Sequence, residues 1–210
     1  ECCELGRRNN EYFGDHIMAG TLSVQKIQGL ATSANPTTVE IASGHKLSGA
    51  AGSIAAPGQV IQTVTVNKTD TFTTSSSSFV DITGMAATIT PSSTNSKILI
   101  LGMLNGSQDV GANRAYVKLL RGDTAICIGD ASGSRIRGLG GFSSNHSTLA
   151  SSPLSYTFLD TPSTTSATTY KLQIASTAGS GTCFVNRTDT DADDGQIRMA
   201  STIVLQEIAG

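Results

Sequence analysis

The 210-residue sequence has no tryptophan, three histidines and few charged side chains, which make up 14% of the chain. A typical globular chain carries about 25% charged residues. The 14 basic and 16 acidic side chains give a net charge of −2, so no positive excess is available to displace counterions from nucleic acid, and a nucleic-acid partner is not expected. The longest strongly apolar run, Ile98–Leu104, is far shorter than the roughly 20 residues of a membrane span. Membrane insertion is therefore not expected either.

Serine and threonine are abundant instead, with 53 residues between them, beside 22 glycines. Hydrophobic residues make up 38% of the chain, and many of them are β-branched. That content can fill a core, which argues against a disordered acidic chain. The composition indicates a soluble β protein rich in hydroxyl groups.

The four cysteines are Cys2, Cys3, Cys127 and Cys183. They form no C-x-x-C pair, and no histidine lies at zinc-ligand spacing from them, so a structural metal site is not expected. Cys127 and Cys183 each lie in strand-like segments and are expected to be small buried side chains. A disulfide between them remains open, because the sequence does not give the distance between their Cα atoms.

Composition divides the chain into three regions. Residues 1–17 hold six charged side chains and form a charged N-terminal extension. Residues 18–58 are rich in Gly, Ala and Ser and have too few large side chains to offset the entropy cost of ordering them, which indicates an attachment arm or stalk held by other chains. Residues 59–210 are the expected folded domain.

The folded region shows short segments of alternating or continuous apolar residues between turn residues, and no helical periodicity. In the segment 170–174, Tyr170, Leu172 and Ile174 are predicted to face inward. The fold class predicted is all-β, an antiparallel β-sandwich or jelly roll with an extended N-terminal arm. The gap from Gly129 to Ser152 is predicted to be a surface excursion. The predicted strands are Val60–Val66, Phe79–Ile82, Met85–Thr90, Lys97–Leu104, Arg114–Leu120, Thr124–Ile128, Leu154–Leu159, Thr169–Ala175, Thr182–Val185 and Ile197–Ile208.

Residues 119–126 indicate a hairpin whose tip is Gly122-Asp123. With Arg121 the tip spells an integrin-type tripeptide. Turn chemistry explains the same residues, so little weight falls on cell adhesion.

No catalytic constellation stands out. The histidines are His16, His45 and His146, and none has a carboxylate specified to orient it. A glycosidase needs two opposed carboxylates, yet Glu40 and Glu207 are the only glutamates after residue 17. The sequence therefore indicates a protein that is not an enzyme, with no catalytic residues and no cofactor.

The acidic segment from Asp189 to Gly195 offers the only candidate metal ligands, Asp189, Asp191 and Asp193. Their alternation supplies hard oxygen ligands of the kind found in calcium loops. The segment departs from such a loop at Asp194, where glycine is required, and at Ala200, where the final glutamate belongs. A solvated hairpin loop between the last two predicted strands is favoured, with a bound cation as the minor hypothesis.

Several segments resemble small virion structural proteins of marine tailed bacteriophages, cyanophages in particular. The resemblance covers roughly residues 18–210 and leaves out residues 1–17. It implies a virion location and a structural role, and it brings no catalytic motif. The segments that carry it are Met18–Leu30, Thr37–Leu47, Phe79–Gly84, Ile89–Ile98, Phe158–Pro162, Thr168–Lys171 and Leu205–Ala209.

The sequence and the resemblance together favour a fibre, expected to be trimeric, that joins other virion proteins through residues 1–58. The loops Gly129–Ser152 and Asp189–Gly195 are then expected to meet host-surface glycan. Two alternatives stay open: a head fibre or capsid decoration protein that stabilises the capsid, and, with less support, an appendage enzyme that degrades glycan.

Overall fold

The computed structural model describes residues 43, 44, 46, 54, 56–109, 114–143, 151–176 and 181–210. The chain divides into two units, residues 1–48 and residues 49–210, and the second contains every strand described below. The described residues contain eleven strands and no helix. Accordingly, no described helix has the length and apolar character to cross a membrane.

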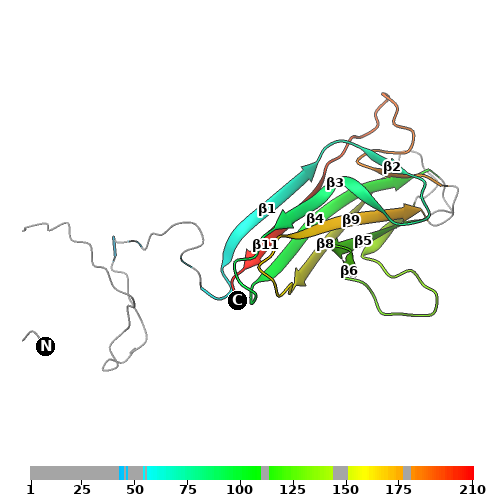
Figure 1. Ribbon diagram of the computed structural model, residues 1–210. Coiled ribbons are helices and arrows are strands. Elements are labelled where there is room, and N and C mark those ends of the chain that lie inside the picture. Colours follow the sequence, from blue (N-terminus) through cyan, green and yellow to red (C-terminus); the bar gives the residue numbers. More distant parts are fainter. Residues whose placement is uncertain are drawn as a thin grey trace, which may run out of the picture. The chain divides into compact units, whose positions relative to one another are not determined.

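The strands form two antiparallel sheets that lie face to face (Figure 1). In the first sheet the order is β1-β11-β4-β10-β2, with β8 on the other side of β4. In the second the order is β3-β9-β5-β6, with β7 also pairing with β5. The strands are β1 (Val60–Lys68), β2 (Phe72–Thr74), β3 (Val80–Ile89), β4 (Lys97–Gln108), β5 (Arg114–Arg121), β6 (Thr124–Ile126), β7 (Gly140–Ser143), β8 (Ser152–Asp160), β9 (Thr168–Ser176), β10 (Cys183–Val185) and β11 (Ser201–Ile208).

In three places, two strands lie end to end and together fill one position of a sheet. β10 and β11 follow one another along the same side of β4, β1 and β2 follow one another along β11 and β10, and β7 and β6 lie along the same side of β5. Counting each such pair once leaves eight positions, which run 1-8-3-6 in one sheet and 2-7-4-5 in the other when numbered along the chain. This order is that of a jelly roll, so the predicted all-β antiparallel fold is confirmed. The extended N-terminal arm lies mostly outside the described residues and stays a prediction.

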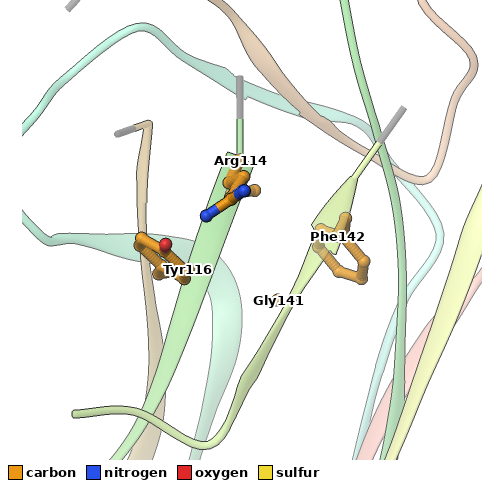
Figure 2. Close-up of a pocket in the computed structure, with 5 residues that line it drawn as sticks. Arg114, Tyr116, Gly141 and Phe142 are labelled. Atoms are coloured by element: carbon orange, nitrogen blue, oxygen red, sulfur yellow. The ribbon is translucent and has the colours of Figure 1, made fainter. Parts of the chain in front are cut away.

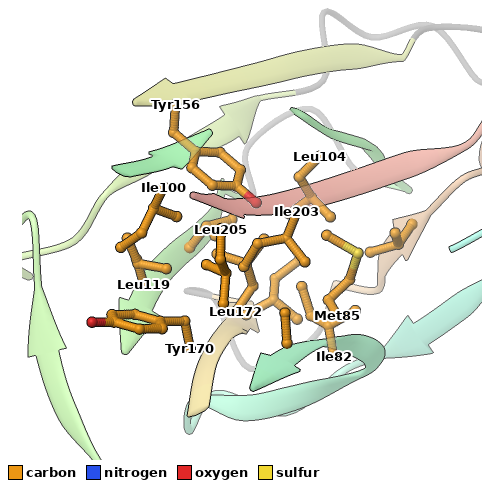
Figure 3. Close-up of a cluster of buried hydrophobic side chains, with 14 of the residues drawn as sticks. Ile82, Met85, Ile100, Leu104, Leu119, Tyr156, Tyr170, Leu172, Ile203 and Leu205 are labelled. Carbon is orange, nitrogen blue, oxygen red and sulfur yellow. The ribbon is translucent and has the colours of Figure 1, made fainter. Parts of the chain in front are cut away.

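The core lies between the two sheets (Figure 3). Its side chains come from alternate positions of each strand, as the period of two requires. Tyr170, Leu172 and Ile174 are fully buried, as predicted. Ile100 and Leu205 meet them from the opposite sheet.

Two glycines in β4 make room for aromatic rings. A Cβ atom at Gly102 would lie 2.3 Å from the hydroxyl oxygen of Tyr156 and 2.4 Å from the carbonyl oxygen of Thr202. A Cβ atom at Gly106 would lie 2.5 Å from the ring of Phe142. The rings of Tyr156 on β8, in the same sheet, and of Phe142 on β7, in the opposite sheet, thus pack over the glycine backbone of β4.

The predicted strands correspond to observed ones, with four main differences. The last strand, predicted from Ile197, begins at Ser201 as β11. Residues Phe72–Thr74, predicted as a connector in part, form β2. Phe79–Ile82 and Met85–Thr90 join into the single strand β3, which absorbs Gly84, at φ +82°, in a bulge. The interval from Gly129 to Ser152 is not all surface excursion, since it contains β7 and the buried Phe142.

The body has two distinct ends. At one end the chain enters β1 and leaves β11, where the Gly58 amide donates to the Ala209 carbonyl at 2.8 Å and the Ala209 amide donates to the Gln59 carbonyl at 2.8 Å. At the other end lie the starts of β5 and β8 and the end of β9 (Figure 1). The predicted boundary at residue 58 falls two residues before β1, and the domain division stays a prediction.

Candidate functional site

The most prominent irregular feature is a protrusion formed by residues 186–200. It interrupts one sheet position, because β10 precedes it and β11 follows it on the same side of β4 (Figure 1). β10 and β11 therefore do not pair with each other, contrary to the hairpin expected between them. The only pairing across the protrusion is an isolated bridge between Arg187 and Arg198.

Asn186 closes the neck of the protrusion. Its backbone has φ 61°, a left-handed conformation that asparagine tolerates better than most residues, and its side chain is fully buried. The side-chain amide donates to the carbonyls of Lys68 at 2.8 Å and Asp70 at 2.9 Å, and the amide oxygen accepts from the Ser201 hydroxyl at 2.6 Å. The neck is thereby tied to the break between β1 and β2.

Asn105 of β4 completes the neck from the other side. Its backbone amide donates to the Ser201 hydroxyl at 3.0 Å, and its side-chain amide donates to the Ala200 carbonyl at 2.6 Å. Its carbonyl accepts from the Asn186 amide at 3.0 Å. Buried polar groups are thus satisfied where the regular ladder is lost.

Arg187 organises the protrusion itself. Its guanidinium lies 4.3 Å from the ring centre of Phe184, a cation–π contact. The same group donates to the carbonyls of Thr188 at 3.0 Å and Asp189 at 2.5 Å. One cation therefore holds the carbonyl groups of two consecutive residues of the protrusion beside Phe184 of β10.

The three candidate metal ligands do not converge. Asp191 lies between two guanidinium groups, 2.8 Å from Arg198 and 3.3 Å from Arg187. Burial, followed by the charge of Asp109, raises the pKa of Asp189, and Asp193 is exposed. Among the described residues no three acidic, histidine or cysteine side chains are placed to hold a metal ion.

Sequence reasoning missed the two arginines as partners of the acidic segment. Their signal was present, since Arg187 and Arg198 flank the four aspartates on either side. Repulsion among the carboxylates is relieved by these flanking guanidinium groups and needs no bound cation.

A shallow cavity of about 280 Å³ lies on the protrusion. It offers an amide from Gln196, carboxylates from Asp191 and Asp193, and the aliphatic side chain of Ile197, which is 56% exposed. Such a mixture suits hydrogen bonding to a polar ligand with a small apolar face. Its lining residues are Asp191, Ala192, Asp193, Gln196, Ile197 and Arg198.

A second cavity of about 280 Å³ lies where β5 and β7 pair (Figure 2). Arg114 and Tyr116 on β5 face Gly141 and Phe142 on β7. Both strands continue from this cavity into residues outside the described ranges.

The remaining candidates are placed as follows. His16, His45 and His146 lie outside the described residues, as do Cys2 and Cys3. Cys183 is fully buried in β10 and Cys127 is half-buried after β6, and both are free thiols, so no disulfide joins them.

The Arg121-Gly122-Asp123 tip is the two-residue hairpin predicted between β5 and β6, since Arg121 pairs with Thr124. The Arg121 guanidinium donates to both oxygens of the Asp160 carboxylate at 3.0 Å. The arginine of the tripeptide is thus held by the body of the domain.

Comparison with protein-family models and with curated proteins gives no match. Among solved structures the chain is similar to infectious bursal disease virus of the Gt strain (15% identity, TM-score 0.39) and of the Gx strain (18%, 0.34), and to the VP2 subviral particle of that virus (15%, 0.37). Each match covers 70% of this chain and 36–38% of the other, so the chain spans well under half the length of these proteins. The jelly-roll assignment rests on the strand order.

Proposed function

We propose that the protein is a non-enzymatic structural component of a virus particle, and that it acts as a fibre displaying its jelly roll for adsorption to a host surface. The proposal combines the resemblance of residues 18–210 to phage virion proteins with the layout of the body. Fold alone does not establish function, because jelly rolls serve many roles.

The single observation that carries the fibre role is that the point where the chain enters the body and the protrusion lie apart from each other along the sheet. The chain enters the body beside its own C-terminus, at the Gly58–Ala209 hydrogen bond. The protrusion interrupts the sheet at the far ends of β1 and β11. A body held through residues 1–58 would therefore present the protrusion away from the particle.

The chemistry of the protrusion suits a glycan better than a charged ligand. Its arginines are already paired with Asp191 or with carbonyl groups, and the Gln196 amide accepts from the Thr188 hydroxyl and donates to Asp194. The groups left for a ligand are the second N–H of the Gln196 amide, the exposed Asp193 carboxylate and the side chain of Ile197. A sugar presents hydroxyl groups and an apolar ring face, which match the amide and Ile197.

Labelling particles with an antibody against residues 59–210 and imaging them by negative-stain electron microscopy tests the proposal. Label at the tail supports the fibre, and label distributed over the capsid would instead indicate a head fibre or decoration protein. Particles that carry no label would contradict a virion role.

A second experiment tests adsorption. Fluorescently labelled protein should bind host cells, and the double variant Gln196→Ala, Ile197→Ala should bind at least about tenfold more weakly, since two contacts of about 1 kcal/mol each are lost. The exposed substitution Thr65→Ala on β1 is the matched control. Incubation with host polysaccharide should release no new reducing ends, and their release would restore the enzyme alternative.

A further inference from the structure

The two sheets have four open edges, and three of them are protected against pairing with another strand. β1 has a register shift between Val60 and Gln62 and lies beside β3. β3 has a bulge between Asp81 and Ala86. β6 and β7 are three and four residues long. Bulges and short strands are the means by which natural sheets prevent edge-to-edge association.

β8, the fourth edge, also lies beside a strand of the other sheet, β7, but it has neither a bulge nor a short length, and its one proline, Pro153, is only its second residue. All nine of its residues pair with β4 in one unbroken register, from Ser152 opposite Gly106 to Asp160 opposite Ile98. The side chains of Ser155, Thr157 and Leu159 lie on the outer face of the sheet, away from the core, and they are exposed and uncharged. Leu159 is 49% exposed, which is unusual for a large aliphatic side chain on a long edge strand.

The backbone groups of the same residues face the open edge. Asn105 directs both its amide and its carbonyl toward Ser201 and Asn186, away from β8. Its partner Pro153 therefore belongs to a pair without mutual hydrogen bonds, and the backbone of Pro153 points outward. Because orientation alternates along a strand, the N–H and C=O groups of Ser155, Thr157 and Leu159 point outward too. No described strand pairs with them.

We propose that this edge pairs with β8 of a second copy of the chain, antiparallel and across a two-fold axis at Thr157. In that register Thr157 faces Thr157 of the second copy and Ser155 faces Leu159. Three pairs form, each exchanging two hydrogen bonds. The two sheets then continue into one.

The absence of charged side chains along this edge favours a second copy of the chain as its partner. Self-pairing places Thr157 opposite itself and brings the same few side chains together, which is unfavourable for an edge of one charge and carries no such repulsion for Ser155, Thr157 and Leu159. The adjoining outward positions of β4 are Leu99, Leu101 and Met103, also uncharged, so the joined sheets would share an apolar and hydroxyl outer face. The outer face of the other sheet differs, because Asp81 and Lys171 form an ion pair there.

This contact is independent of the proposed virion role and differs from the trimer that the resemblance implies, because an isologous contact closes as a dimer. The full-length chain is expected to sediment as a dimer in analytical ultracentrifugation. Thr157→Lys places two positive charges directly opposite each other, so its dissociation constant should rise at least about tenfold. Thr65→Lys, an exposed threonine on β1 of the same outer face, is the matched control and should leave the dimer intact.

A charge-swap mixture identifies the partner strand. Thr157→Lys and Thr157→Glu chains, each weakened alone, should associate with each other when mixed at low ionic strength. A monomeric wild-type chain, an assembly indifferent to Thr157→Lys, or Lys and Glu chains that fail to combine would each overturn the proposal. Association that depends on residues 1–58 and not on Thr157 would assign the contact to the arm. Circular dichroism of each variant checks that the fold is retained.

Discussion

The side-chain amide of Asn186 spans the break between β1 and β2, donating to the carbonyls of Lys68 and Asp70. β11 pairs with β1 and β10 with β2, so the 15 residues of the protrusion and the short gap in the neighbouring strand lie at the same level of the sheet. One side chain thus replaces the ladder hydrogen bonds that both interruptions remove.

Replacing Asn186 should therefore destabilise the whole domain. Asn186→Gly keeps the left-handed backbone accessible, but it leaves the carbonyls of Lys68 and Asp70 without the amide that donates to them and the Ser201 hydroxyl without its acceptor, so we expect the free energy of unfolding to fall by about 3 kcal/mol. Urea denaturation measures the change. Asn67→Gly, at an exposed position of β1 whose side chain accepts one hydrogen bond from Thr202, is the control and should cost about 1 kcal/mol. Equal effects of the two substitutions would show that the neck is not specially stabilising.

The fold could be predicted from the sequence to the extent that hydrophobic alternation determines it. Tyr170, Leu172 and Ile174 face inward because a strand alternates, and the hairpin at Gly122-Asp123 follows from turn chemistry. The short strands β2 and β7 were missed, because three or four residues rich in Thr or Gly carry no periodic signal. Their pairing depends on tertiary partners such as Gly106, which receives Phe142.

The candidate site was harder to predict than the fold. The acidic segment was located correctly as a loop, but its structure depends on Asn186, whose side chain contacts the carbonyls of Lys68 and Asp70 far away in the sequence. Local patterns do not contain such contacts.

The two glycines of β4 should respond differently to substitution. The three atoms nearest to a Cβ at Gly106 all belong to the ring of Phe142, whereas a Cβ at Gly102 would clash with the Tyr156 ring and with the backbone carbonyl of Thr202. We expect both to cost about 3 kcal/mol by overpacking. Phe142→Leu should recover part of the loss in the Gly106→Ala background, while Tyr156→Leu should not rescue Gly102→Ala. A double-mutant cycle by thermal denaturation measures the coupling, and rescue at both positions would refute the assigned role of the Thr202 backbone.

Glu207 should make stability depend on pH. Its buried carboxylate accepts hydrogen bonds from the Ser92 amide and hydroxyl, both at 2.7 Å, and from Gln62. Burial opposes its ionisation, but the hydrogen bonds, led by that from Gln62, outweigh burial and hold the pKa below the ordinary value of 4.5. Because the folded pKa is depressed, this stabilisation is present above pH 4.5 and is lost as the pH falls through the folded pKa.

Glu207→Gln should accordingly lower the free energy of unfolding by about 2 kcal/mol at pH 7, and the difference from wild type should shrink in acid. Urea titrations between pH 3 and about pH 7 measure it. Ser92→Ala, which removes one of the two Ser92 donors, should cost about 1 kcal/mol at neutral pH. A Glu207→Gln deficit that stays constant across the range would show that the charge of Glu207 is unimportant.

We expect Arg121 to stabilise the folded domain through Asp160 and not to serve cell adhesion as part of the Arg121-Gly122-Asp123 tripeptide. Its partner Asp160 is 6% exposed and also accepts from the Tyr170 hydroxyl at 2.6 Å. Asp160→Asn leaves the arginine without its counter-charge, and we expect a loss of about 2 kcal/mol, reduced from a fully buried pair because the arginine is partly exposed. Asp123→Asn, at the exposed tip, should change the melting temperature by less than about 2 °C. Integrin-dependent cell attachment abolished by Asp123→Asn would contradict this assignment.

Arg187 should control the protrusion without controlling the domain. Arg187→Met keeps an aliphatic stem against Phe184 but removes the hydrogen bonds to the carbonyls of Thr188 and Asp189 and the ion pair with Asp191. Amide hydrogen exchange in residues 188–198 should then accelerate at least about tenfold, since each charged hydrogen bond contributes about 1.5 kcal/mol, while exchange in β4 and β9 stays unchanged. Arg198→Met loses only the contact with Asp191, and its 62% exposed side chain predicts a smaller acceleration. If Arg187→Met accelerates exchange in β4 as much as in the protrusion, the protrusion is not an independent unit, and the host contact proposed for it could not vary without unfolding the body.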